Sequence, residues 1–158
     1  PSCIRTVETG NRAIYLFDCW HKHKNAAVRV REHRATCCLI ESGQFRPVME
    51  PLVITEYLLI NETLLGEVLT LNDSPFSRKF VVHARAPNDA RQTLTPALQT
   101  IILQYKEKFS DTYLHIAIGS SGAVLMTEET LDHDRWQDII ALALAIETTV
   151  FSKLLHGE

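Results

Sequence analysis

Long apolar runs are missing from this 158-residue chain. The longest, residues 139–146, is about eight residues, well short of the ~18 that a helix needs to cross a bilayer. No signal peptide, internal repeat or low-complexity segment is visible either. We therefore expect residues 1–158 to form a single globular domain. The chain begins with Pro1 rather than Met, so we also expect it to be excised from a longer protein, with any membrane segment outside it.

Neither sign of charge is in large excess, since 16 basic residues and 19 acidic residues give a net charge of −3. Nucleic-acid-binding proteins usually show a clear basic excess, so no nucleic-acid partner is expected. The local exception is a basic stretch within residues 22–34, which contains Lys22, Lys24, Arg29, Arg31 and Arg34. This stretch could bind an acidic protein or acidic lipid head groups, or it could be an ordinary solvated strand face.

Metal-ligand motifs are absent, because neither Cys-x-x-Cys nor His-Glu-x-x-His occurs. The best ligand candidates are His21 and His23, with Cys19 and His33 nearby. Two histidines in a basic turn are more often solvated than metal-bound, so we predict no metal and no cofactor. Asp132 and Asp134 are explained more simply as helix-start acids than as acid–base catalysts. Residues 119–122 are explained as a hairpin turn rather than a phosphate loop, because no helix follows them.

Cysteine is limited to Cys3, Cys19, Cys37 and Cys38. Cys37 and Cys38 are adjacent and would point to opposite faces of a strand, so they are poorly placed to pair. We expect reduced thiols in the cytoplasm. The alternative is a secreted domain with a Cys3–Cys19 or Cys19–Cys37 bridge. A cysteine nucleophile at Cys37 or Cys38 is disfavoured, because an apolar strand raises the thiol pKa.

Residue patterns predict an α+β fold with a mostly antiparallel sheet, two or three helices and a long C-terminal helix. Strands are predicted at residues 13–19, 28–33, 35–41, 67–71, 79–84, 113–118 and 123–126, with a polar turn at 21–25 and a hairpin joining 28–33 to 35–41. Helical spacing occurs at 52–65, with a strand as the alternative, and again after Thr95 and Pro96. The last helix is expected to follow a Thr130 cap and to run to about Leu155, a length of ~35 Å.

Four short motifs carry a resemblance to a known family. They occupy residues 16–18 (Leu-Phe-Asp), 33–36 (His-Arg-Ala-Thr), 75–82 (Pro-Phe-Ser-Arg-Lys-Phe-Val-Val) and 94–98 (Leu-Thr-Pro-Ala-Leu). With this order and spacing, the chain resembles a bacterial family of uncharacterised proteins whose soluble α+β domain usually follows a two-helix membrane anchor. The resemblance is weakest at residues 44–65. It implies a cytoplasmic domain at the inner face of the membrane, and it implies no reaction.

The loop before residue 80 is the best binding candidate within these motifs. Phe76, Ser77, Arg78 and Lys79 combine aromatic, polar and basic groups, although Phe76 and Phe80 could instead anchor the loop in the core. Together these patterns predict a non-catalytic protein-interaction or scaffold domain of a membrane-associated bacterial assembly, with a protein as partner. The alternatives are a hydrolase-type enzyme that uses a cysteine nucleophile or a His-bound metal, and a small-ligand sensor.

Overall fold

A computed structural model describes residues 5–9, 11–24, 30–45, 48, 50–56 and 66–155. Its sheet has eight strands in the order β1-β2-β3-β8-β7-β4-β6-β5, and every neighbouring pair is antiparallel. The strands are β1 (Arg5–Thr9), β2 (Arg12–Lys24), β3 (Val30–Ser42), β4 (Leu52–Thr55), β5 (Glu67–Val68), β6 (Val81–Ala84), β7 (Leu114–Gly119) and β8 (Gly122–Thr127).

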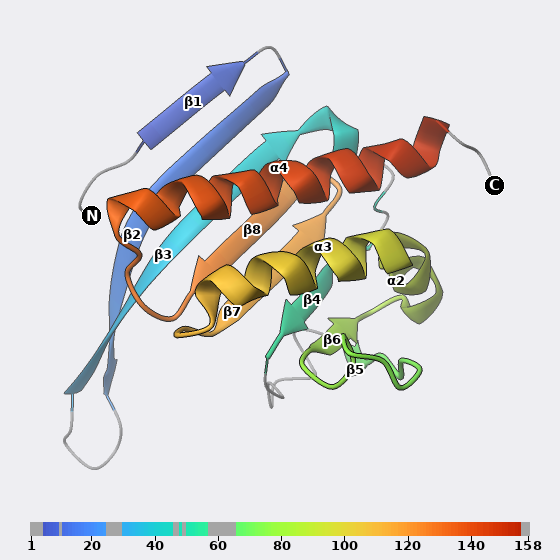
Figure 1. Ribbon diagram of the computed structural model, residues 1–158, viewed down its shortest axis with the longest axis horizontal. Coiled ribbons are helices and arrows are strands. Elements are labelled where there is room, and N and C mark those ends of the chain that lie inside the picture. The colour runs from blue at the N-terminus through green and yellow to red at the C-terminus, as the bar shows by residue number, and fades with distance from the viewer. Residues whose placement is uncertain are drawn as a thin grey trace.

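Three helices accompany the sheet: α2 (Pro87–Thr93), α3 (Pro96–Lys106) and α4 (His133–Leu155). Two short 3-10 turns, η1 (Gly43–Phe45) and η2 (Glu107–Phe109), complete the described elements. Helices α3 and α4 lie side by side across one face of the sheet, and the β2–β3 hairpin extends beyond them (Figure 1). The predicted α+β class, with a mostly antiparallel sheet and a long C-terminal helix, is confirmed.

A single row of apolar side chains across six strands forms the centre of the core. Successive cross-strand partners place these residues opposite one another on the helix-covered face: Leu16, Cys38, Leu125, Ile116, Ile54 and Val82. All six are almost completely buried. Because side chains alternate between the two faces of a strand, this row fixes which residues face the other way.

Helix α4 covers this row with an apolar stripe that includes Ile139, Leu142 and Ile146. Glu147 interrupts the apolar character on the buried side. Its carboxylate is fully buried and lies 2.5 Å from the Arg12 guanidinium at the start of β2. Removing the partly exposed Arg12 would leave the buried Glu147 carboxylate without a compensating charge, so this contact ties the helix to its neighbouring strand.

The helix starts are set by the residues that satisfy free backbone N–H groups. The Thr95 hydroxyl accepts a hydrogen bond from the Leu98 N–H at 3.2 Å, which confirms the predicted α3 cap. The predicted Thr130 cap of α4 is wrong, because the helix begins three residues later at His133. Asp132 caps it instead, since its carboxylate accepts from the Arg135 N–H at 2.9 Å.

Three local predictions fail because pairing with neighbouring strands determines the structure there, against the preference of the local sequence. The polar turn at 21–25 is wrong, because residues 21–24 continue β2 and pair with residues 30–33. The two strands at 28–33 and 35–41 do not form a hairpin, because residues 30–42 are one continuous strand, β3. The helix predicted at 52–65 is wrong over 52–55, where the strand alternative is confirmed as β4, between β7 and β6. Residues 57–65 lie outside the described part of the chain, as do residues 28 and 29.

Close backbone contact makes Gly122 sensitive to substitution. A Cβ atom at Gly122 would lie 2.0 Å from the carbonyl oxygen of Ile40 on β3, whereas one at Gly119 would meet nothing closer than 3.9 Å. We expect Gly122→Ala to lower the free energy of unfolding by about 2 kcal/mol or more, because β3 and β8 must separate. The matched change Gly119→Ala should stay within about 0.5 kcal/mol of wild type in urea denaturation. Equal losses for both variants would contradict this account.

Candidate functional site

The loop proposed as a binding site is largely engaged with itself. Phe76 is 1% exposed, and its ring centroid lies 5.0 Å from that of Phe80, so it is a core anchor. The Ser77 hydroxyl donates to the Asn72 carbonyl at 2.9 Å and accepts from the Ser74 N–H at 2.9 Å. Neither Phe76 nor the Ser77 hydroxyl is therefore presented to a partner.

The two cations of this loop lie at the surface. Arg78 makes two 2.8 Å hydrogen bonds to the Asp73 carboxylate, and both side chains are exposed. This pairing holds the pKa of Asp73 below its ordinary value and raises that of Arg78. Lys79 is exposed. Of the four predicted loop residues, only Arg78 and Lys79 present charge to solvent.

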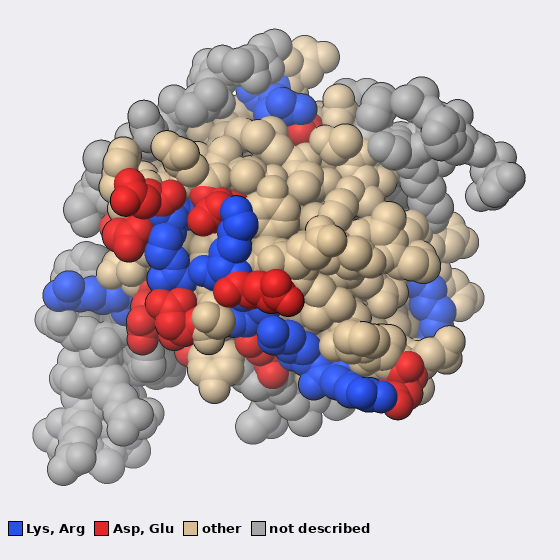
Figure 2. All heavy atoms as spheres, in the orientation of Figure 1, with Lys and Arg blue, Asp and Glu red and all other residues tan. Residues whose placement is uncertain are grey.

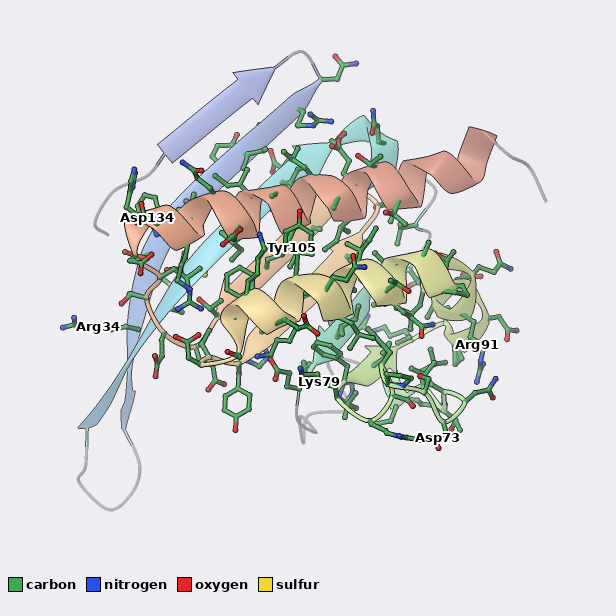
Figure 3. The ribbon with its side chains drawn as sticks, in the orientation of Figure 1. Arg34, Asp73, Lys79, Arg91, Tyr105 and Asp134 are labelled. Carbon is green, nitrogen blue, oxygen red and sulfur yellow. The ribbon has the colours of Figure 1, made fainter. Side chains whose placement is uncertain are left out.

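The basic stretch lies elsewhere on the molecule. Arg34 is exposed on β3, and Figure 3 shows it well away from Lys79. Lys22 and Arg31 belong to β2 and β3, but their side chains are not among those described, and Arg29 lies outside the described residues. The structure thus does not bring the two predicted binding regions into one site.

A buried lysine organises the end of α3. The Lys106 ammonium group is almost completely buried and donates to the carbonyl oxygens of Phe109 at 2.6 Å and Thr112 at 2.9 Å. It also lies 3.3 Å from the Glu56 carboxylate, which accepts a 2.7 Å hydrogen bond from the Leu114 N–H. These contacts neutralise the buried charge and hold the turn between α3 and β7 in place.

A hollow of about 430 Å³ opens beside this lysine, lined by Glu56, Lys106, Asp111, Tyr113, Glu128 and Glu129 among others. Asp111 is occupied by two hydrogen bonds from Arg135, at 2.6 and 2.8 Å, which hold the pKa of Asp111 below its ordinary value. Glu128 lies 3.2 Å from the His115 ring. Figure 2 shows acidic and basic side chains mixed over this part of the surface. The contacts of Asp111 with Arg135 and of Glu128 with His115 are typical of a structural charge network.

The opposite face of the sheet is apolar as well. One row of cross-strand partners on it consists of Tyr15, Leu39, Val124, Ala117 and Val53. A second row contains Phe17, Cys37, Met126 and His115. We call these nine residues the open face, because α3 and α4 both lie on the other side (Figure 1). Sequence reasoning missed this surface, although β2, β3 and β8 carry apolar residues at both odd and even positions.

Exposure on the open face is concentrated over β2, β3, β8 and β7. Val124 is 40% exposed, and Tyr15, Phe17, Leu39 and Met126 are half-buried. The same face is closed at Thr55 of β4 and at His83 of β6, because both side chains are fully buried. The accessible apolar surface thus lies over β2, β3, β8 and β7, with half-buried Val53 of β4 at its margin.

Two thiols meet at one end of the open face. The Cys19 and Cys37 sulfur atoms are 3.3 Å apart across β2 and β3. Burial, reinforced by the contact with Cys19, raises the pKa of Cys37 to about 12. Burial alone raises the pKa of Cys38, on the helix-covered face, to about 12. Both Cys37 and Cys38 are therefore thiols at neutral pH, which makes them weak nucleophiles.

No family model, curated protein sequence or solved structure matches this chain. The family resemblance drawn from the short motifs therefore stays a prediction. Of the helices that the structure describes, none is both long and apolar enough to cross a membrane. Within the described residues, no group of three His, Cys, Asp or Glu side chains is arranged to hold a metal ion.

Removing the Lys106 charge should destabilise the fold. Lys106→Met keeps an apolar chain of similar length but leaves the Glu56 carboxylate and two carbonyl oxygens without their cation. We expect the free energy of unfolding to fall by about 3 kcal/mol in urea denaturation. The control is Lys79→Met, which changes an exposed lysine and should shift stability by less than about 0.5 kcal/mol. A Lys106→Met variant as stable as the control would contradict the structural role.

Proposed function

We propose that this protein is a non-catalytic protein-interaction domain and that the open face is its docking surface. The observation that carries the proposal is the pair of apolar rows over β2, β3, β8 and β7, with Val124 40% exposed at their centre. Burying apolar surface contributes roughly 25 cal/mol per Å², so a contiguous patch of this kind favours association.

We further propose that the occupant is a second copy of the same chain, packed sheet against sheet. A two-fold axis parallel to the strands, between β3 and β8, would place β3 of one copy over β8 of the other and β2 over β7. In that arrangement Tyr15 meets Ala117, and Leu39 meets Val124. Large side chains would then oppose small or medium ones, which is the complementarity that sheet packing at ~10 Å requires.

The setting of this domain is part of the same proposal. A cytoplasmic position at the inner face of the membrane, within a bacterial assembly, is supported by the sequence resemblance. The exposed cations Arg34, Arg78 and Lys79 lie outside the open face, so they would stay available to an acidic partner after two copies associate.

Substituting one valine should separate the two copies. Val124→Lys places an ammonium group at the centre of the proposed interface, where its desolvation opposes association. We expect light scattering after size exclusion to give twice 17.9 kDa for the wild type and 17.9 kDa for Val124→Lys. The matched control is Val68→Lys on β5, because Val68 is 41% exposed but lies at the far edge of the sheet. This control should remain dimeric.

Circular dichroism should show the same folded content for both lysine variants, so that a change in mass reports association alone. A wild-type chain that stays monomeric at its highest soluble concentration would contradict docking between copies. Equal dissociation of Val124→Lys and Val68→Lys would show that the interface lies somewhere other than the open face.

A further inference from the structure

The sulfur atoms of Cys37, on the open face, and Cys19, just beyond its end, are close enough to react with each other. Cys19 lies opposite Ala35, and Cys37 lies opposite Phe17, so the two cysteines are diagonal neighbours on the same face of the β2–β3 pair. Their sulfur atoms are 3.3 Å apart, and Cys19 is partly exposed. A disulfide requires about 2.05 Å between the sulfurs, so closing the gap needs a shift of roughly 1.2 Å.

We propose that Cys19 and Cys37 form an oxidation site, at which a hydroperoxide converts the dithiol into an intramolecular disulfide linking β2 to β3. This inference does not depend on the proposed docking surface. It assigns a covalent modification to two residues outside the helix-covered core, which is formed by the opposite face of these strands.

The chemistry balances with the hydroperoxide as the only co-reactant. The Cys19 thiolate attacks the terminal peroxide oxygen, so an S–O bond forms, the O–O bond breaks and an alcohol leaves after protonation. The Cys37 sulfur then attacks the Cys19 sulfur, so the S–S bond forms, the S–O bond breaks and water leaves with the Cys37 proton. The two sulfur atoms together lose two electrons, and the peroxide gains them.

The different surroundings of the two thiols determine that Cys19 reacts with the hydroperoxide first and Cys37 reacts second. Cys19 is partly exposed and can meet the oxidant, whereas Cys37 is buried and its pKa is raised to about 12. Cys37 therefore acts as the resolving residue, and its contact with Cys19 compensates for its weak acidity because the sulfenic acid forms next to it.

The neighbouring residue Cys38 provides a matched internal control. It follows Cys37 directly but faces the helices, where it is fully buried and opposite Leu16 and Leu125. Its backbone belongs to the same strand, so any general opening of β3 would expose it together with Cys37. Oxidation that depends on the thiol–thiol contact should leave Cys38 reduced.

The cross-strand pair Asp18 and Thr36, next to the two cysteines, connects this site to the segment before α4. The Thr36 hydroxyl donates to the Asp18 carboxylate at 2.6 Å and accepts from the Leu131 N–H at 2.8 Å. Asp18 and Thr36 are cross-strand partners on the helix-covered face, one residue away from each cysteine. A shift of β2 against β3 would therefore act directly on the segment that leads into α4.

The test is to treat the folded wild-type chain with tert-butyl hydroperoxide, alkylate the remaining thiols and map the peptides by mass spectrometry. The expected result is a peptide pair linked through Cys19 and Cys37, the loss of two hydrogens from the chain, and an alkylated Cys38. Dithiothreitol should restore alkylation of both Cys19 and Cys37. Cys38→Ser should still form the link, whereas Cys19→Ser and Cys37→Ser should each abolish it.

Two results would overturn the proposal. One is a link between Cys3 and Cys19, or between separate chains, in place of the Cys19–Cys37 link. The other is over-oxidation of Cys19 to a sulfinic acid while Cys37 is still fully alkylated. Mapping the wild-type chain decides between these outcomes even if a cysteine variant fails to fold.

Discussion

The antiparallel register shared by β2, β3, β8, β7 and β4 is the constraint on which everything else depends. It places Leu16, Cys38, Leu125, Ile116 and Ile54 in one row beneath the helices. The same register places the residues between them on the opposite face. A slip of one residue would exchange the two faces completely, so it would expose the core row and bury the open face under α4. Stability and the proposed interaction surface are thus two results of one pairing pattern.

Both faces of the sheet carry apolar side chains, but the chain's own helices cover only one of them. On one side the chain supplies its own cover, and Glu147 with Arg12 fixes the position of α4 over β2. On the other side α3 and α4 supply no cover, and the accessible part lies over β2, β3, β8 and β7, with Val53 of β4 at its margin. The Cys19–Cys37 contact lies at the β2–β3 end of that region. A bond between these strands would therefore form at the edge of the surface on which docking is proposed to occur.

Much of the architecture was predictable from local pattern. The β7–β8 hairpin and the start of α3 followed from Gly119 and Gly122 and from the Thr95–Pro96 pair, because these signals act over a few residues. Strand β4 was predicted only as the alternative to a helix, since Ile54, Tyr57 and Leu58 have helical spacing. Pairing of residues 52–55 with β6 and β7, which no local pattern shows, makes this segment a strand. The open face was missed for the same reason. Its rows assemble residues from five strands, and only the register shows that they are neighbours.

The enclosure of Lys106 has a consequence for how one end of the fold is held together. An ammonium ion surrounded by two carbonyl oxygens and a carboxylate resembles a monovalent cation in a coordination shell. Many turns rich in carbonyl oxygen recruit such an ion from solution, and their order then varies with the salt present. Here the cation is attached to α3 by its own side chain, so it is never lost by dilution. The carbonyl oxygens of the turn between α3 and β7 are therefore bound by a cation that belongs to the chain itself, and no ion has to be taken up from solution.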